Sequence, residues 1–263
     1  MIRGRVLIVS GSDSSGGAGL QADIKTVTCL GGYAATAVTA LTAQNTNGVC
    51  STHNVPPDFV AQQIKVVMKD IGADVIKVGM LSSAPIVRAV AKSLTDYAQN
   101  VPRIIDPVMS AKGGYKLITR RAVGVLMDTL IRGAAVITPN LPEAEILTGL
   151  SIRTVEDMER AVEPLRSLGA DSVVLKGGHL PGEDIVDFLI TENGFERFEG
   201  KRIATSSTHG TGCTFASAIA SGLAQGLNLH DAVKRARNYV QKAIALAPGL
   251  GMGCGPLNHS HGI

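Results

Sequence analysis

The chemically most distinctive stretch of the sequence is THGTGCT, residues 208–214, which leads into an alanine-rich apolar segment. Its glycines allow backbone N–H groups to turn inward, and a helix that begins here would add the partial positive charge of its N-terminus. We therefore predict an anion hole for phosphate. Two other interpretations stay open: a close helix contact that requires small residues, and a Cys–His nucleophile, because His209 and Cys213 are four residues apart.

Charged side chains follow several β-branched runs, at the points where strands would end. Asp106 follows one such run, and Asn140 and Glu143 open a helical segment after another. Oxygen ligands of this kind suit Mg²⁺, although each carboxylate alone is also typical of a helix cap or an ion pair. Lys176 follows the apolar run SVVL and precedes two glycines. From this position its side chain can reach phosphate oxygens or simply extend to solvent. Hydrolase chemistry would leave these groups without a role, whereas a phosphate-handling site uses them all.

A second glycine-rich segment, GSDSSGGAGLQAD, covers residues 11–23. Residues 17–22 fit the pattern G-x-G-x-x-[GA], but a dinucleotide site also requires an acid about 20 residues further on. No Asp or Glu occurs between Asp23 and Asp58, which argues against that interpretation. Two interpretations of this segment remain open. It forms either a tight turn or a loop whose backbone approaches a small molecule near Asp23. The sequence contains no G-x-x-x-x-G-K-[ST], which excludes P-loop kinases and GTPases.

The elements that must position these groups follow from periodicity. β-Branched runs alternate with segments of helical period, which is typical of a mostly parallel α/β sheet. The predicted strands are residues 5–11, 35–41, 74–80, 103–108, 135–140 and 172–178, followed by an edge hairpin of 184–191 and 195–203 and by helices at 211–225 and 229–247. Because ligands bind beyond the carboxyl ends of parallel strands, we expect the charged groups to converge on one edge of the sheet.

Composition narrows the class of protein. With 263 residues and 45% hydrophobic content, we expect one domain spanning residues 1–263. A net charge of +3 and 3% aromatic residues argue against nucleic acid, and the lack of a long apolar run argues against a membrane. Four cysteines without a C-x-x-C pair predict reduced thiols and a cytoplasmic protein. Cys254, His259 and His261 are interpreted as an unstructured tail rather than a metal site.

Eight segments together resemble a known family. They are GSDSSGGAGLQADIKT, TALTAQNTNGV, KVGMLSS, DPVMSAKGG, TPNLPEAEILTG, VLKGGHL, THGTGCT and GPLNHSHG. In this order they are similar to the bacterial hydroxymethylpyrimidine/phosphomethylpyrimidine kinases of thiamine biosynthesis, members of the ribokinase-like superfamily, and the similarity covers essentially the whole chain. The resemblance implies a three-layer α/β/α sandwich with a mostly parallel central sheet and a small antiparallel edge hairpin, a homodimer, and ATP with Mg²⁺.

The implied activity is two successive phosphorylations of 4-amino-5-hydroxymethyl-2-methylpyrimidine. Pyridoxal kinase is the alternative, since it shares the superfamily, the cofactor and a flat heteroaromatic substrate. A non-catalytic pyrimidine-binding protein is a third hypothesis from a different class. It is disfavoured because binding alone would not need Lys176, Asp106, Glu143 and Cys213 together.

The resemblance also implies roles for individual residues. Asp23 and Gln44 would hydrogen-bond the aminopyrimidine edge, Met80 and Val108 would form apolar walls, and Gly11 and Ala18 would complete the substrate site. The implied ATP ligands are Lys176, Thr208, Asn140, Glu143, Gly210 and Gly212, and the implied Mg²⁺ ligands are Asp106 and Glu143. The implied catalytic group is Cys213 with Gly210, Thr211, Gly212 and Lys176.

Cys213 and Ser14 differ from common patterns of these relatives. Superfamily members usually have an aspartate base at the position of Cys213, which implies that the thiol substitutes as the base, with its thiolate favoured by the helix dipole. Ser14 stands where the family often has proline, so the glycine loop is expected to be less preorganised.

Overall fold

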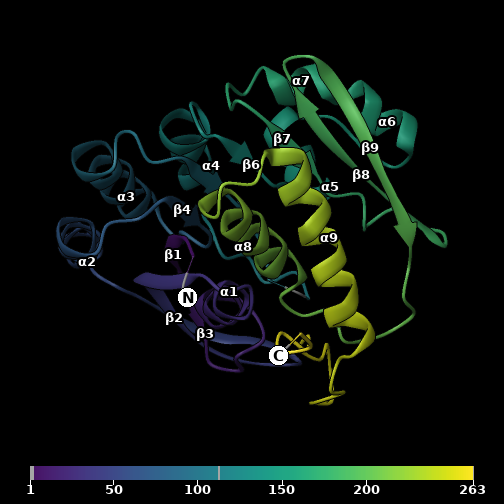
Figure 1. Cartoon of the computed structure of the whole chain (residues 1–263), viewed down its shortest axis with the longest axis horizontal. Coiled ribbons are helices and arrows are strands. Elements are labelled where there is room, and N and C mark those ends of the chain that lie inside the picture. The colour runs from purple at the N-terminus through teal and green to yellow at the C-terminus, as the bar shows by residue number, and fades with distance from the viewer. Residues whose placement is uncertain (1–2, 112, 263) are drawn as a thin grey trace.

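A continuous nine-stranded sheet forms the centre of the protein in the computed structural model, which describes residues 3–111 and 113–262 (Figure 1). The strand order is β3-β2-β1-β4-β5-β6-β7-β8-β9. The strands are β1 (Arg5–Asp13), β2 (Tyr33–Asn45), β3 (Gly48–Asn54), β4 (Val75–Val78), β5 (Arg103–Ile105), β6 (Val136–Ile137), β7 (Val173–Leu175), β8 (Asp184–Thr191) and β9 (Gly194–Lys201).

The sheet is parallel in its centre and antiparallel at both edges. Strands β2, β1, β4, β5, β6 and β7 run parallel. The predicted hairpin is confirmed as β8 and β9, which continue the sheet antiparallel from β7. A second hairpin, between β2 and β3, closes the other edge and was not predicted. The residues of β3, GVCSTHN, are mostly exposed and lack the apolar alternation that marks a half-buried strand.

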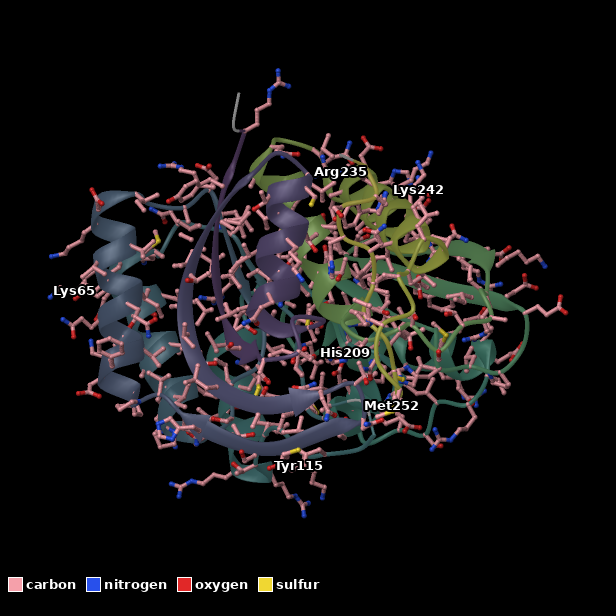
Figure 2. All side chains as sticks on the ribbon, turned by 90° about the horizontal axis from the view of Figure 1, so that it is seen from below. Lys65, Tyr115, His209, Arg235, Lys242 and Met252 are labelled. Carbon is pink, nitrogen blue, oxygen red and sulfur yellow. The ribbon has the colours of Figure 1, made fainter. Side chains whose placement is uncertain are left out.

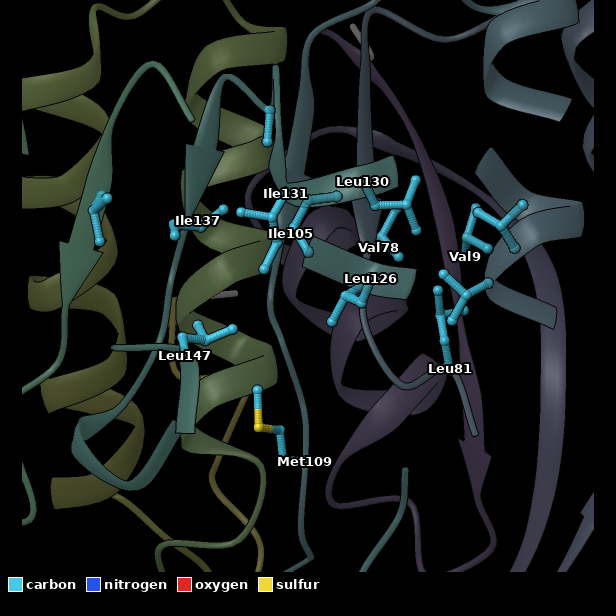
Figure 3. Packing of buried hydrophobic residues seen from close by; sticks show 14 of the residues in the cluster. Val9, Val78, Leu81, Ile105, Met109, Leu126, Leu130, Ile131, Ile137 and Leu147 are labelled. Carbon is cyan, nitrogen blue, oxygen red and sulfur yellow. The ribbon is translucent and has the colours of Figure 1, made fainter. Parts of the chain in front are cut away.

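Helices cover both faces of the sheet, which confirms the three-layer sandwich. Along β1, Val6 and Ile8 pack with one helical layer while Leu7 and Val9 pack with the other, as the two-residue period of a strand requires. Figure 3 shows part of the apolar cluster that contains Leu7 and Val9. In it, Leu126 and Leu130 lie against the strands. The first layer contains α1 (Gly19–Cys29), α8 (Thr211–Ala224) and α9 (Leu229–Ala245), seen in front of the sheet in Figure 1. The opposite layer contains α2 (Pro57–Asp70), α3 (Ala84–Tyr97), α4 (Arg120–Leu126), a π-helical turn (Met127–Ile131), α5 (Leu141–Thr148), α6 (Val155–Arg160) and α7 (Val162–Arg166).

Several central strands are shorter than predicted, and this positions the site. β5 ends at Ile105 and β7 at Leu175, so Asp106 and Lys176 directly follow the last residues of these strands. α8 begins directly after Gly210, which has a φ of 85°. A side chain there would overlap the Gly17 carbonyl oxygen, so only glycine lets the two glycine-rich loops approach this closely.

The C-terminal segment is ordered, and the prediction of an unstructured tail is wrong. His259 is buried and lies 2.9 Å from the Thr214 hydroxyl, while the Asn258 N–H donates to the Ala243 carbonyl at 3.0 Å. In Figure 2 this yellow segment passes close to His209 and carries the exposed Met252. Contacts with α8 and α9 supply the order that the segment's own sequence does not signal.

Two further observations concern the described residues as a whole. No helix of the described chain has both the length and the apolar character needed to cross a membrane. The part of the chain that the structure describes also contains no group of three or more His, Cys, Asp or Glu side chains arranged to hold a metal ion.

Candidate active site

One cleft of about 680 Å³ runs along the carboxyl ends of the parallel strands. It extends from the end of β2, past the start of α8, to a space between the β8–β9 hairpin and α9. The predicted site residues that line it are Gly11, Ala18, Gln44, Met80, Asp106, Val108, Asn140, Glu143, Lys176, Thr208, Gly210, Thr211, Gly212 and Cys213. The fold thus brings together every predicted site residue except Asp23.

Asp23 lies beneath the cleft, and the direct pyrimidine contact predicted for it is corrected. Its side chain is fully buried, and both carboxylate oxygens lie 2.9 Å from Nζ of the equally buried Lys77. The Ser217 hydroxyl donates a third hydrogen bond to Asp23 at 2.7 Å. Burial would lower the pKa of Lys77, but the adjacent Asp23 carboxylate raises it above its usual value, which favours the charged form of the lysine. A lysine inside the apolar run VIKV was the available signal for this partner.

Lys176 and Asp106 form an ion pair inside the cleft. Lys176 Nζ lies 3.1 Å from Asp106 Oδ1, which also accepts a hydrogen bond from the Thr138 hydroxyl at 3.0 Å. Burial would raise the pKa of Asp106, but the Lys176 and Lys77 ammonium groups hold it below its usual value. A Cβ built on Gly212 would lie 3.3 Å from Lys176 Nζ, so this ammonium stands over the first turn of α8.

Glu143 caps a helix and also lines the cleft, so the predicted helix cap is confirmed and its role as a Mg²⁺ ligand stays a prediction. Its Oε2 accepts the Asn140 N–H at 2.8 Å, and the Asn140 side chain accepts the Glu143 N–H at 2.9 Å, which is a complete capping box. Burial raises the pKa of Glu143 to about 7, although Lys176 acts in the opposite direction. The second carboxylate oxygen is not needed by the cap.

Cys213 lies half-buried in the first turn of α8. Burial raises the pKa of its thiol to about 12 and the Asp23 and Asp106 carboxylates act in the same direction, although the Lys77 ammonium and the Gly19 N–H lower it. The expectation of a thiolate favoured by the helix dipole is therefore wrong, because desolvation penalises the charged form more than the dipole stabilises it.

This pKa predicts slow alkylation of Cys213. We expect iodoacetamide at about pH 8 to modify the exposed Cys50 first, since the thiolate is the reactive form. Because the thiol is neutral below a pKa of about 12, its modification rate should keep rising with pH up to the highest pH at which the protein stays folded. Mass spectrometry of digests at several pH values measures both rates, and a plateau for Cys213 near neutral pH would contradict the expectation.

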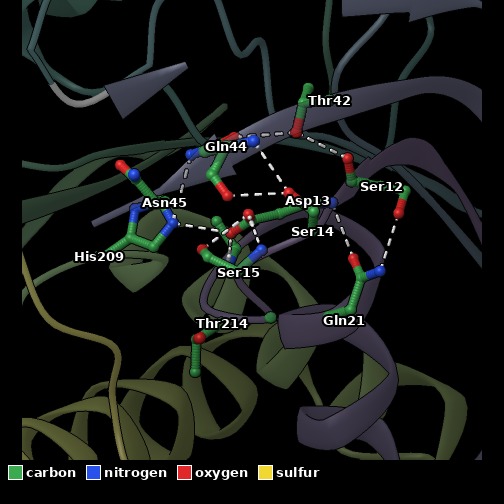
Figure 4. Close-up of polar contacts among 12 residues, drawn as sticks. Ser12, Asp13, Ser14, Ser15, Gln21, Thr42, Gln44, Asn45, His209 and Thr214 are labelled. Atoms are coloured by element: carbon green, nitrogen blue, oxygen red, sulfur yellow. Dashed lines mark hydrogen bonds and ion pairs between the residues drawn. The ribbon is translucent and has the colours of Figure 1, made fainter. Parts of the chain in front are cut away.

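His209 and Asp13 form a buried contact beside the cleft that the sequence did not reveal (Figure 4). His209 Nε2 lies 2.7 Å from Asp13 Oδ2, which also accepts the Ala18 N–H at 2.8 Å. Burial would raise the pKa of Asp13, but hydrogen bonds from His209, Ser15 and Ala18 lower it to about 2. The side-chain contacts of His209 are to Asp13 and Gln44 and not to Cys213, so the structure gives no support to a Cys–His nucleophile.

The site has the parts of a phosphoryl-transfer centre without a P-loop. A glycine-rich helix start, a lysine and two carboxylates meet at the carboxyl edge of a mostly parallel sheet, which defines a ribokinase-like small-molecule kinase. Comparison with known proteins agrees, because the family described as phosphomethylpyrimidine kinase matches residues 13–258. The chain belongs to this family.

Individual relatives support the same assignment. The hydroxymethylpyrimidine/phosphomethylpyrimidine kinase of Bacillus subtilis is 43% identical, over 97% of this chain and 94% of its own length. A thiamine biosynthesis bifunctional protein of Geobacter sulfurreducens is 55% identical over 98% of this chain, which spans only 52% of that longer protein. Among solved structures, the ADP complex of Bacillus subtilis pyridoxal kinase superposes with a TM-score of 0.90 at 35% identity, covering 98% of each chain.

Proposed function

We infer that this protein is a hydroxymethylpyrimidine/phosphomethylpyrimidine kinase, which phosphorylates the hydroxymethylpyrimidine and then its monophosphate. The observation that carries this inference is the position of Lys176 over the start of α8, in a cleft of about 680 Å³ that Asp106 and Glu143 also line. Family membership and identities above 40% to named kinases of this kind support the substrate class.

The substrate end of the cleft is formed by the carboxyl ends of β1 and β2 and by the segments that follow β1 and β4. We propose that Gln44 hydrogen-bonds the pyrimidine, with Met80 and Val108 against the faces of the ring. Gly11 and Ala18 complete the end wall, where a side chain on Gly11 would collide with Met80. Cys213 then lies nearest the hydroxymethyl group. With a pKa of about 12, its thiol is neutral in the free enzyme.

The nucleotide end lies between the β8–β9 hairpin and α9. Its apolar walls come from Ile185, Ile203, Val240 and Ile244, which were not recognised in the sequence and suit a flat adenine ring. We propose that Thr208 and Asn140 bind ATP phosphate oxygens together with the N–H groups of the anion hole. The residues fit this role because these N–H groups and the Lys176 ammonium converge on the same volume.

Asp106 and Glu143 are the residues that would hold Mg²⁺. Two carboxylates beside a phosphate site match what this ion binds in proteins, where water and phosphate supply the remaining ligands. When bound, Mg²⁺ neutralises charge on the transferred phosphate. The chain itself contributes the fixed dipoles of α8 and the Lys176 cation on the same side of the cleft, so that little reorganisation is needed during the reaction.

A coupled assay that detects ADP tests the function directly. We expect turnover with the hydroxymethylpyrimidine and with its monophosphate, each at a higher kcat/KM than with pyridoxal. Pyridoxal is included because a pyridoxal kinase shares the fold at 35% identity, below the 43% and 55% of the thiamine-pathway relatives. Preference for pyridoxal would reverse the assignment, and no turnover with any of the three would refute it.

Replacing Glu143 with glutamine should weaken metal dependence rather than the fold. The new amide oxygen can still accept the Asn140 N–H, so we expect a change in unfolding free energy within about 1 kcal/mol. The Mg²⁺ concentration for half-maximal activity should rise by about 10-fold or more, because even indirect partners of a metal affect its affinity by this much. Magnesium titration of the ADP assay measures the shift, and unchanged dependence would leave Glu143 with only its capping role.

We also propose that the protein is a homodimer and that it is located in the cytoplasm. The family resemblance implies both properties. All four cysteines are free thiols, which suits a reducing compartment. Sedimentation equilibrium of the purified protein measures the oligomeric state.

A further inference from the structure

The peptide groups on either side of the Lys176 Cα are both held by hydrogen bonds to neighbouring segments. The Lys176 N–H donates to the Pro139 carbonyl at 2.9 Å, and the Gly177 N–H donates to the Asp187 side chain at 2.8 Å. Because peptide groups are planar, only φ and ψ of Lys176 are soft between them. With both peptide groups held, the direction in which the Lys176 side chain leaves the backbone is fixed as well.

Asp187 makes the second of these contacts from the neighbouring strand β8. It is the next residue of β8 beyond the last pair of the β7–β8 ladder, which joins Leu175 to Phe188. Its largely buried carboxylate accepts the Gly177 N–H, and a carboxylate is a stronger acceptor than a neutral carbonyl group. The contact therefore holds the chain at the point where β7 has ended and Lys176 lines the cleft.

The segment that follows Lys176 is held closely against β8. A Cβ built on Gly177 would overlap the Val186 carbonyl oxygen, so this approach requires glycine. The Arg202 guanidinium donates at 2.6 to 3.0 Å to three carbonyl groups further along the segment, those of Gly178, Leu180 and Gly182. Asp187 thus fixes the first peptide group after Lys176, and Arg202 fixes the residues beyond it.

Arg237 compensates the charge of Asp187. Its guanidinium forms an ion pair with the second carboxylate oxygen of Asp187. The side chains of Arg237 and Asp187 are only 15% and 11% exposed, so either charge alone would be poorly solvated. Arg237 belongs to α9, whose Val240 and Ile244 line the nucleotide end of the cleft. The ion pair therefore joins this wall of the cleft to β8.

We propose that Asp187, in its ion pair with Arg237, is a positioning residue for phosphoryl transfer, which fixes the Gly177 peptide group and thereby aims Lys176 over the first turn of α8. The proposal rests on the proposed function of the site. Lysine has a flexible four-carbon side chain, so its ammonium is confined only if its backbone is fixed first. Displacement of a group by about 1 Å at a reacting centre can cost about 100-fold in rate.

Paired substitutions remove the hydrogen bond without leaving an uncompensated buried charge. In the asparagine variant, Asp187→Asn with Arg237→Met, an oxygen remains for the Gly177 N–H. In the leucine variant, Asp187→Leu with Arg237→Met, no acceptor remains. Both lack the ion pair, and replacing a buried pair with apolar side chains often leaves stability unchanged or raises it. The two variants therefore differ only in the side chain at position 187.

The hydrogen bond itself is tested without any substrate. Labelling glycine with ¹⁵N and the lysine carbonyl with ¹³C selects the glycines that follow a lysine, which are Gly113 and Gly177. We expect the Gly177 amide hydrogen to exchange with solvent about 2–10-fold faster in the leucine variant than in the asparagine variant, the effect of one hydrogen bond. The exposed Gly113 is the internal control and should exchange equally in both. Equal exchange of Gly177 would overturn the proposal.

A cycle of variants asks whether Asp187 acts through Lys176. In the ADP assay, we expect kcat of the leucine variant to be about 10–100-fold below that of the asparagine variant. The same comparison in proteins that also carry Lys176→Met should give a ratio close to 1, because no ammonium is left to aim. Urea unfolding checks that all four proteins are folded under the assay conditions. Equal ratios with and without Lys176 would mean that Asp187 serves only the fold, and would overturn the positioning role.

ATP binding separates this proposal from the proposed function. If the wild-type protein phosphorylates neither pyrimidine nor pyridoxal, the proposed function is wrong, and calorimetry with ATP replaces kcat as the measurement. The leucine variant should then bind ATP about 2–10-fold more weakly than the asparagine variant when Lys176 is present, and equally well with Lys176→Met. That pattern would leave the positioning of Lys176 standing. Equal ATP affinity of the two variants with Lys176 present would overturn it.

Discussion

Replacing Lys176 with methionine is expected to lower kcat by about 10²–10³, the usual effect of removing one group aimed at developing charge. The ammonium lies over the first turn of α8 and 3.1 Å from Asp106, in a partly buried position where a charge is poorly screened by water. Its loss leaves the phosphate site with backbone dipoles only. The ADP assay at saturating substrate gives kcat, and the KM for ATP shows how much of the effect is binding.

Lys201 provides the matched control for this experiment. It also borders the cleft, but its side chain is 75% exposed and pairs with the exposed Asp184. Lys201→Met should therefore keep kcat within about threefold, since exposed ion pairs are worth little. Equal losses in the two variants would mean that general positive charge, and not the position of Lys176, serves the reaction. A Lys176→Met enzyme with nearly full kcat would remove Lys176 from the proposed machinery.

The second large effect concerns the buried pair of Lys77 and Asp23. Both side chains are completely buried, so removing one charge leaves the other without compensation. We expect Lys77→Met to lower the free energy of unfolding by about 3–5 kcal/mol. Urea unfolding with linear extrapolation measures this loss.

A double variant separates the uncompensated charge from the loss of packing. Asp23→Asn with Lys77→Met removes both charges of this pair, and the asparagine oxygen can still accept the Ser217 hydroxyl. We expect it to be more stable than Lys77→Met alone. The exposed pair of Lys92 and Asp96 is the control, where Lys92→Met should cost less than about 1 kcal/mol. A double variant no more stable than Lys77→Met would show that packing, and not charge, dominates.

The case of Asp23 illustrates why a site residue predicted from a pattern can have another role. Asp23 lies one helical turn inside the glycine loop, close to the cleft in sequence terms, and resemblance assigned it to the substrate. Its partner Lys77 lies 54 residues away on a neighbouring strand. Local sequence contains no information on which face of α1 (Gly19–Cys29) meets that strand, and this face decides whether the carboxylate contacts a ligand or a lysine.

The sequence by itself determined the mostly parallel α/β sheet, one edge hairpin and the set of residues at the carboxyl edge, whereas the three-layer sandwich was implied by the family resemblance. The first three features follow from short-range physics: a two-residue apolar period in strands, a helical period between them, and the rule that parallel strands end on one edge. Glycine spacing likewise indicated the anion hole, because the backbone conformation that Gly210 adopts is local.

Only the tertiary structure decided the partners and the ionisation of the site. His209 meets Asp13 across 196 residues, and the C-terminal segment is ordered because α8 and α9 offer it hydrogen-bond partners. The Cys213 thiol has a pKa of about 12 because the surrounding elements bury it, although the helix N-terminus alone predicts the opposite shift. Desolvation and ion pairing depend on all the residues that the folded chain places around a group, and a local sequence pattern does not specify those residues.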